Sequence, residues 1–413
     1  MSAYDIKNLK ASIPIGILAA LLMVTGGMHA SAAAEPDVFN ASPRAKPRPT
    51  LVVVPFYVEI CPGIQADRNG LVGASAAIQQ CLDKTASPWT IPPGTYKLDT
   101  ALTFHRGISI QGDGVAWVAD LNVRGYDAHW GHGLIYAGYL PDPVEIHGLR
   151  IDGNGYSRRG AGRVPFCDGT GAASYGANLV LDNVPDVILD RVVTTNAPCG
   201  SGMVIIGTRA RITNSHFTYN GTQEGGVKNM WSDGLTLLEC WNCVVEGNTF
   251  VNNSDVAFVF GGGQGTRVAG NQIIQTTPAF AGFMLDNFND SRSGDFRGTV
   301  VEDNWIDCGA LQCSFGISMG PHTWYLSKNT VGGVVRGNTV HGAKIGMIAQ
   351  GAGTKEFPVV VYANDVSSLV PDGTEVEFSC GARTTFTRAA NPNSFLDTGG
   401  YASWSPAVHV LCP

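Results

Sequence analysis

Two aspartates, Asp233 and Asp255, stand 22 residues apart, and each precedes a short run of apolar residues. Two carboxylates held close together titrate as a pair, because the charge on one raises the pKa of the other, so that one can act as an acid and the other as a base. Glycoside cleavage uses such a pair. The alternative is that both aspartates are turn residues whose side chains accept hydrogen bonds from backbone amides.

Other side chains nearby in the sequence could assist such a pair. Asp286 is a candidate third acid in the segment Asp-Asn-Phe-Asn-Asp, whose oxygens could also bind Ca²⁺, although the spacing is not that of an EF-hand. Lysine and arginine pair with sugar carboxylates, and aromatic rings stack on sugar faces. The candidate substrate-binding residues are Lys228, Trp231, Arg292, Arg297 and His322. Hydrolysis by two carboxylates needs no cofactor or metal, whereas calcium would enter with a lyase mechanism.

A repeated pattern must position these residues. An aliphatic residue is followed three positions later by a small polar residue and then, after one more residue, by an apolar one, and the clear copies begin at Ile212, Val245, Val268, Val301, Val335 and Val361. From Ser215 onward the polar positions lie 23 to 34 residues apart, which is the period of a solenoid with one coil per repeat. Each coil must stack on its neighbours to bury its aliphatic residues. The prediction is an all-β chain that forms a single right-handed parallel β-helix.

The polar positions of the repeat predict a scaffold rather than a catalytic site. Asparagine tolerates the left-handed backbone of a turn, and side chains stacked about 4.8 Å apart can form a hydrogen-bonded ladder. We expect this ladder at Asn248, Asn271, Asn304, Asn338 and Asn364.

A second recurring position in the same coils, usually occupied by glycine, aligns the two aspartates with each other. Glycines recur at positions 202, 234, 282, 316 and 346, and Val256 takes that place in one coil. This alignment predicts that Asp233 and Asp255 occupy equivalent positions of adjacent coils, about one strand spacing apart.

Composition and the chain ends bound the setting. The net charge of −7 and the absence of a basic run argue against nucleic acid or an acidic membrane as a partner. Lys7 and Lys10 precede an apolar run and then small residues, as in a secretory signal peptide. We expect a signal peptide at 1–34, a linker at 35–55, the β-helix at 56–370 and a C-terminal cap at 371–413. The protein would then be secreted, with no membrane association after cleavage.

Ten cysteines agree with an oxidising compartment. Pairing in sequence order, one of the connectivities that the sequence allows, predicts five local disulfides: 61–81, 167–199, 240–243, 308–313 and 380–412. Cys240-Trp-Asn-Cys243 could instead be a redox or zinc motif, but no second such motif or histidine pair accompanies it, so a structural pair is favoured.

Three segments near the N-terminus carry a family resemblance. They are Ala74-Ser-Ala-Ala-Ile-Gln-Gln-Cys-Leu-Asp83, a short amphipathic helix, then Pro-Pro-Gly-Thr-Tyr96 and Gly107-Ile-Ser-Ile-Gln-Gly-Asp-Gly114. With them the chain resembles the pectate-lyase-like β-helix superfamily over about residues 60–370. The resemblance implies a β-helix opened by a capping helix. It implies less about function, because the fold carries lyases, hydrolases, epimerases and binding proteins.

The aspartate register is closest to the polygalacturonase group, glycoside hydrolase family 28. That group carries the triplet Asn-Thr-Asp, then Asp-Asp one coil later, then His-Gly and Arg-x-Lys. Trp-Ser-Asp233 keeps only the aspartate of the triplet, and Ser-Asp255-Val keeps only the first aspartate of the second motif. Gln264 stands roughly where the family has histidine, and the Arg-x-Lys is missing. The resemblance therefore implies a divergent carbohydrate-active protein rather than a true polygalacturonase.

The sequence thus predicts a secreted enzyme, a glycosidase that cleaves a polysaccharide or oligosaccharide by carboxylate acid/base catalysis. A polysaccharide lyase or C5-epimerase acting on a uronate polymer is the first alternative. A non-catalytic carbohydrate-binding surface protein is the second.

Overall fold

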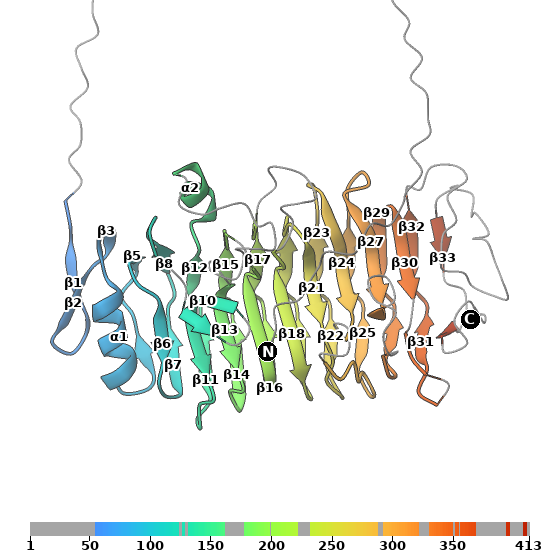
Figure 1. The fold of residues 1–413 in the computed structure, drawn as a ribbon, viewed down its shortest axis with the longest axis horizontal. Coiled ribbons are helices and arrows are strands. Elements are labelled where there is room, and N and C mark those ends of the chain that lie inside the picture. The colour runs from blue at the N-terminus through green and yellow to red at the C-terminus, as the bar shows by residue number, and fades with distance from the viewer. Residues whose placement is uncertain are drawn as a thin grey trace, which may run out of the picture. The chain divides into compact units, whose positions relative to one another are not determined.

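The computed structural model describes residues 54–123, 126–128, 131–161, 177–198, 200–221, 232–287, 292–321, 330–349, 352–354, 356–368, 394–396 and 408–410. In this part the chain winds in coils, and each complete coil adds one strand to each of three sheets whose pairing is almost entirely parallel (Figure 1). The all-β parallel β-helix expected from the repeat is therefore confirmed.

The sheets are numbered in the order in which a coil visits them. Sheet I contains β6 (Leu102–Phe104), β9 (Tyr126–Ala128), β10 (Gly131–Gly138), β13 (Ala177–Asp182), the start of β16 (Met203–Thr213), β18 (Leu235–Cys240), β21 (Val256–Phe260), β24 (Ala279–Leu285), β27 (Cys313–Met319) and β30 (Ile345–Ala349). Sheet II contains β4 (Trp89–Thr90), β7 (Ile108–Gln111), β11 (Val144–His147), β14 (Asp186–Asp190), the end of β16, β19 (Val244–Glu246), β22 (Arg267–Ala269), β25 (Val300–Glu302), β28 (Val334–Arg336), β31 (Val359–Tyr362) and β34 (Val408–Val410). Sheet III contains β3 (Asn69–Gly73), β5 (Gly94–Leu98), β8 (Val115–Ala119), β12 (Arg150–Asp152), β15 (Val193–Thr195), β17 (His216–Thr218), β20 (Thr249–Val251), β23 (Gln272–Ile274), β26 (Trp305–Asp307), β29 (Thr339–Ala343), β32 (Asp365–Ser368) and β33 (Ser394–Leu396).

The repeat buries its apolar positions in the interior of the coils. The aliphatic residues that begin the six copies are all buried in one core: Ile212, Val245, Val268, Val301, Val335 and Val361. The apolar position that ends each copy faces the same core, where the rings of Phe217 and Phe250 stack with their centroids 4.7 Å apart. Burial of one such side chain contributes about 1.5–3 kcal/mol. Because that burial depends on the next coil, the coils stabilise one another.

The asparagine ladder lies at the turn between sheets II and III. Asn248 donates its backbone N–H and its side-chain amide to Oδ1 of Asn271, and Asn271 donates in the same way to Asn304. The pattern continues through Asn338 to Asn364. All five side chains are buried, which confirms their scaffold role.

A helix and a hairpin cover the N-terminal end of the described coils (Figure 1). Helix α1 (Ser75–Lys84) buries Ile78, Cys81 and Leu82, and the hairpin is formed by β1 (Tyr57–Cys61) and β2 (Ile64–Asp67). The Cys61–Cys81 disulfide joins hairpin to helix. A second short helix, α2 (Gly155–Gly160), follows β12. The capping helix expected from the sequence is therefore present, since unpaired strand edges at a solenoid end need a cover.

Three of the five predicted disulfides are present: Cys61–Cys81, Cys240–Cys243 and Cys308–Cys313. The predicted pairs 167–199 and 380–412 lie outside the described residues, as do the signal peptide and most of the linker and C-terminal cap. At the C-terminal end, β33 pairs antiparallel with β32 and β34 pairs parallel with β31. In the described ranges, no helix has the length and apolar character needed to cross a membrane.

Candidate functional site

Asp233 and Asp255 lie at the turn that leads from sheet III into sheet I, Asp233 two residues before β18 and Asp255 directly before β21. Leu235 pairs with Phe258 in the parallel ladder, which places Asp233 opposite Val256. Asp255 lies opposite Ser232, to whose carbonyl its backbone N–H donates a hydrogen bond of 3.1 Å. The two aspartates are therefore offset by one residue rather than equivalent, and Ala257, not Val256, continues the glycine register.

The offset still leaves the two aspartates as neighbours. Within a strand, an offset of one residue would place two side chains on opposite faces of the sheet. Asp233 and Asp255 lie before their strands, so this alternation does not apply to them. Oδ1 of Asp233 accepts a hydrogen bond of 3.3 Å from the backbone N–H of Val256, the residue that follows Asp255. The carboxylate of Asp233 thus reaches across to the coil of Asp255.

Two hydroxyl groups hold the Asp233 carboxylate. Thr236 donates from Oγ1 to Oδ2 of Asp233 at 2.6 Å, and Ser201 donates to the same oxygen at 3.3 Å. The two hydroxyl oxygens are themselves 2.5 Å apart. Ser201 comes from the preceding coil at the register position of Asp233, while Thr236 comes from β18. Hydrogen bonds to a carboxylate favour its charged form.

Burial and mutual repulsion set the titration of the pair. Burial raises the pKa of Asp233 from its ordinary 3.8 to about 6, although the hydrogen bonds from Thr236, Val256 and Ser201 act in the opposite direction. Burial, and then the charge of Asp233, raise the pKa of Asp255 well above its ordinary 3.8, and no hydrogen bond from a described residue offsets this. Both residues remain partly exposed. The two carboxyl groups therefore titrate as a coupled pair, in which Asp233 gives up its proton first and its charge makes Asp255 keep a proton to higher pH.

This pair makes the stability of the protein depend on pH. Between pH 3.8 and about 6 the folded protein binds more protons at Asp233 than the unfolded chain does, so the free energy of unfolding falls as the pH rises through this interval. Asp255 extends the fall to higher pH. At about 1.4 kcal/mol per pKa unit, we expect Asp233 alone to contribute a loss of about 3 kcal/mol between about pH 4 and about pH 7, and Asp255 to add to it.

Urea unfolding of the wild type and of the double variant Asp233→Asn/Asp255→Asn at several pH values measures this loss. The carboxylates elsewhere in the protein are common to both proteins, so the difference in slope isolates the pair. Parallel stability curves for the two proteins would show that the aspartates titrate normally.

An aromatic pair adjoins the aspartates on the following coils. Phe280 lies opposite Asp255, with its backbone N–H 2.8 Å from the Asp255 carbonyl oxygen, and its ring meets that of Phe315 edge to face at 5.1 Å between centroids. Both rings are partly exposed. Such rings can stack on sugar faces. Neither ring was singled out in the sequence, and nor were Ser201 and Thr236, although Ser201 occupies the position of Asp233 in the glycine register.

Asp286 does not join the pair. It follows β24 at the opposite end of sheet I, six residues beyond Phe280, which corresponds to about 20 Å along an extended strand. Its side chain is buried, and Oδ1 accepts a hydrogen bond of 2.5 Å from the backbone N–H of Asn287. The sequence assigned Asp286 to the correct coil. Each coil has three turns between its strands, however, and Asp286 lies at the turn that follows the sheet I strand, whereas Asp233 and Asp255 lie at the turn that precedes it.

The other candidates either lie near Asp286, at the turn after β24, or fall outside the described residues. Arg297 forms an ion pair of 2.7 Å with Asp295 and lies over the ring of Phe357. Burial lowers the pKa of the Arg292 guanidinium, while the nearby charges of Glu239 and Asp182 raise it. Both arginines follow β24, at the turn from sheet I into sheet II.

Three candidates remain predictions, because Lys228, Trp231 and His322 lie outside the described residues. Gln264, which stands roughly at the position of the polygalacturonase histidine, lies at the same turn from sheet I into sheet II and donates to Asp295 at 2.8 Å. The described residues contain no group of three or more His, Cys, Asp or Glu side chains placed to hold a metal ion.

Comparisons with known proteins give similarity at the level of the fold. No family model matches this sequence. No curated protein matches it either. Among solved structures, a hyperthermoactive exopolygalacturonase from Thermotoga maritima aligns with a TM-score of 0.43 at 14% identity, over 77% of each chain. A surface adhesin of Streptococcus pneumoniae aligns with a TM-score of 0.40 at 14% identity, over 72% of this chain and 84% of the adhesin.

A third solved structure is the A-module of a mannuronan C-5 epimerase from Azotobacter vinelandii. It aligns with a TM-score of 0.35 at 16% identity, over 74% of this chain and 98% of the module. By their names the three proteins differ in activity. Similarity at this level therefore leaves the function to be argued from the site.

Proposed function

We propose that this protein is a secreted glycoside hydrolase that cleaves a polysaccharide by acid/base catalysis, with Asp233 and Asp255 as the catalytic pair. The observation that carries the proposal is the asymmetry of the pair. Ser201 and Thr236 donate hydrogen bonds to Asp233, which favour its charged form against the effect of burial, whereas Asp255 has no described donor and lies against the charge of Asp233. One carboxyl group is thus prepared to donate a proton and the other to accept one or to attack.

The proposed roles follow from these protonation states. Asp255 donates its proton to the glycosidic oxygen as the bond to the leaving sugar breaks. Asp233 acts on the sugar carbon, either by activating a water molecule or as the nucleophile. The partly exposed rings of Phe280 and Phe315 are placed to stack on a sugar bound at the pair. Ser201 and Thr236 serve as positioning residues for Asp233.

The geometry favours hydrolysis over β-elimination. A lyase or epimerase needs a base for the C5 proton and a cation that stabilises the charge on the adjacent carboxylate. Of the cations predicted from the sequence, Arg292 and Arg297 lie at the other end of sheet I. Elimination therefore remains the second candidate, which would require Lys228 or another cation from outside the described residues.

Mass spectrometry of the products decides between these reactions. The purified protein is incubated with a panel of plant, algal and bacterial polysaccharides, with and without a calcium chelator. Hydrolysis is expected to add the mass of one water molecule per cleavage, without an ultraviolet-absorbing product and without loss of activity in the chelator. Unsaturated products that absorb in the ultraviolet would identify a lyase, and binding without products would identify a carbohydrate-binding protein.

A further inference from the structure

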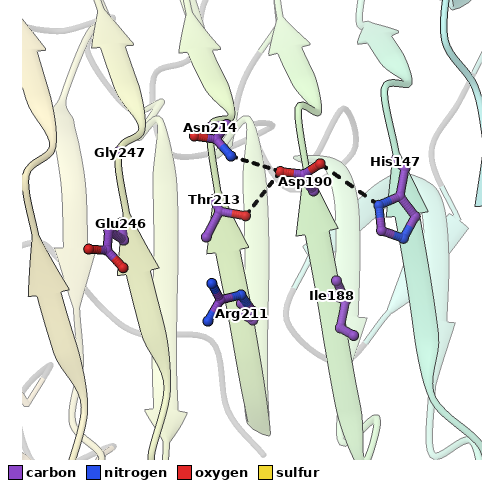
Figure 2. A pocket seen from close by; sticks show the side chains of 8 residues that line it. All are labelled: His147, Ile188, Asp190, Arg211, Thr213, Asn214, Glu246 and Gly247. Atoms are coloured by element: carbon purple, nitrogen blue, oxygen red, sulfur yellow. Dashed lines mark hydrogen bonds and ion pairs between the residues drawn. The ribbon is translucent and has the colours of Figure 1, made fainter.

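A polar groove of about 660 Å³ opens on the outer face of sheet II (Figure 2). The aspartate pair precedes strands of sheet I and does not line it. The groove spans four successive coils, through β11, β14, β16 and β19. The residues that line it are His147, Ile188, Asp190, Arg211, Thr213, Asn214, Glu246 and Gly247. None of them was singled out as functional in the sequence.

One row of polar side chains crosses the groove. The parallel register aligns His147 with Asp190, then Asp190 with Thr213, and then Thr213 with Glu246, each on the next coil. The groove therefore presents one polar side chain per coil, at the strand spacing of about 4.8 Å. This repeat is close to the length of one pyranose unit in a sugar chain, so a chain laid across the coils would meet one such side chain per sugar.

Asp190 organises the middle of this row and is fully engaged by the protein. Its Oδ1 accepts hydrogen bonds from Asn214 at 2.9 Å and from Thr213 at 3.1 Å, and its Oδ2 accepts one from Arg191 at 2.9 Å (Figure 2 shows the first two). The hydrogen bond from Asn214 is the largest cause that lowers the pKa of Asp190, and Arg191 and Thr213 add to it. Asp190 is thus a fixed anion that orders its neighbours rather than a free acceptor for a ligand.

Arg211 is different from the other arginines on the strands of sheet II. Arg209 pairs with Asp186 at 2.9 Å, and Arg267 and Arg336 both pair with Glu302. In its own row, Arg211 stands between Ile188 and Val244. Its side chain is exposed and has no ion pair or hydrogen bond with any residue in the described ranges. The groove therefore contains a guanidinium whose five donors meet no acceptor among the described residues.

We propose that this groove binds a chain of uronate sugars, with Arg211 pairing with a sugar carboxylate and Asn214 and Glu246 accepting hydrogen bonds from sugar hydroxyls. A guanidinium binds a carboxylate through two parallel hydrogen bonds, which fits one acidic group at the centre of the groove. The carbonyl of Asn214, and the carboxylate of Glu246, whose Oε1 already accepts a hydrogen bond of 2.9 Å from Arg267, supply acceptors in the groove. This proposal is independent of the hydrolytic proposal, because no residue of the aspartate pair lines the groove.

Calorimetric titration with two probes, the tetramers of galacturonate and of mannuronate, tests the groove. The protein carries Asp233→Asn and Asp255→Asn, so that catalysis by the pair cannot consume the probe. Arg211→Gln is compared with Arg209→Gln, a matched variant two residues away on the same face of β16 whose arginine is already paired with Asp186. A neutral tetramer of glucose serves as the ligand control.

We expect at least one uronate tetramer to bind with a Kd of about 1 mM or lower, and Arg211→Gln to weaken this binding about tenfold or more, on the scale of one charge-assisted hydrogen bond. Arg209→Gln is expected to leave the Kd within about twofold. Because Arg211 is exposed, its replacement is not expected to unfold the protein.

The proposal is overturned if neither uronate tetramer binds, if the glucose tetramer binds equally well, or if both arginine variants weaken binding to the same degree. The last result would show attraction by general surface charge rather than a specific pairing. None of these results bears on whether the aspartate pair hydrolyses a glycosidic bond.

Discussion

Replacement of Asp255 by asparagine is expected to lower turnover of a natural glycosidic bond by about 10²- to 10⁴-fold, which is the usual contribution of a general acid. Asparagine keeps the size of the side chain but has no proton to give. The loss should be small on a 4-nitrophenyl glycoside of the same sugar, because that leaving group departs without protonation. Asp233→Asn should impair both substrates, since the residue that acts on the sugar carbon is needed in each case.

Asp307→Asn provides the matched control, because Asp307 ends β26 near another turn from sheet III into sheet I, where its Oδ1 accepts a hydrogen bond from the backbone N–H of Gly309. It should leave turnover within about threefold. If Asp255→Asn cleaved the natural bond as fast as the wild type, Asp255 would not be the acid. If Asp255→Asn slowed cleavage of both substrates equally, the assignment of Asp255 as the acid and Asp233 as the residue that acts on the sugar carbon would be wrong.

The pH dependence gives a second view of the same pair. Turnover needs Asp233 ionised and Asp255 protonated, so the acid limb of the profile reports Asp233 and is expected near pH 6. The alkaline limb reports the proton of Asp255, whose pKa is raised further by the charge of Asp233. Thr236→Val removes the shorter of the two hydroxyl bonds to Asp233, and we expect it to move the acid limb to higher pH.

Replacement of Asn271 by alanine is expected to destabilise the protein by about 3 kcal/mol or more. Its side chain accepts two hydrogen bonds from Asn248 and donates to the Val245 carbonyl and to Asn304. Removal leaves the buried backbone N–H of Asn248 without its acceptor, and each buried unpaired polar group costs about 1–3 kcal/mol. Urea unfolding followed by circular dichroism measures the change.

Gln272→Ala is the matched control for this variant, because Gln272 is the next residue along the chain and its side chain is exposed. Its effect should stay within about 0.5 kcal/mol. Equal stability of the two variants would show that the ladder does not hold the coils together. Because coils depend on their neighbours, the transition of Asn271→Ala is also expected to become broader as coils unfold separately.

Much of the fold could be predicted because its determinants are local and repeated. An aliphatic residue such as Val245 can be buried only against the next coil, and Asn248 three positions later satisfies the turn amide of its neighbour. Each copy of the pattern therefore predicts both the local turn and the stacking of its coil on the next one. The three disulfides that the described residues contain join cysteines close in sequence, so neighbour pairing was correct for them.

The site was less predictable, because two positions must be known for each residue. One is the coil to which the residue belongs, and the other is the turn of that coil at which it lies. Counting along the repeat assigned Asp286 to the coil after Asp255, which is correct. Its place at the opposite end of sheet I depends on where β24 begins and ends. The start of β21 was uncertain in the same way. The sequence alignment placed Val256 rather than Ala257 with the glycines, so the predicted position of Asp255 was wrong by one residue.

By itself, the sequence determined that this chain stacks coils, that its asparagines form the ladder, and that Asp233 and Asp255 lie on adjacent coils, because each of these follows from a pattern that recurs once per coil. Only the tertiary structure decided which side chains share a corner. It brought Ser201 and Thr236 to Asp233, left Asp255 with burial and repulsion, and placed Arg211 in a groove where no described residue pairs with it. The physical reason is that turn length and burial, which set these contacts and the pKa of each carboxyl group, depend on the neighbouring coils and have no signature within one repeat.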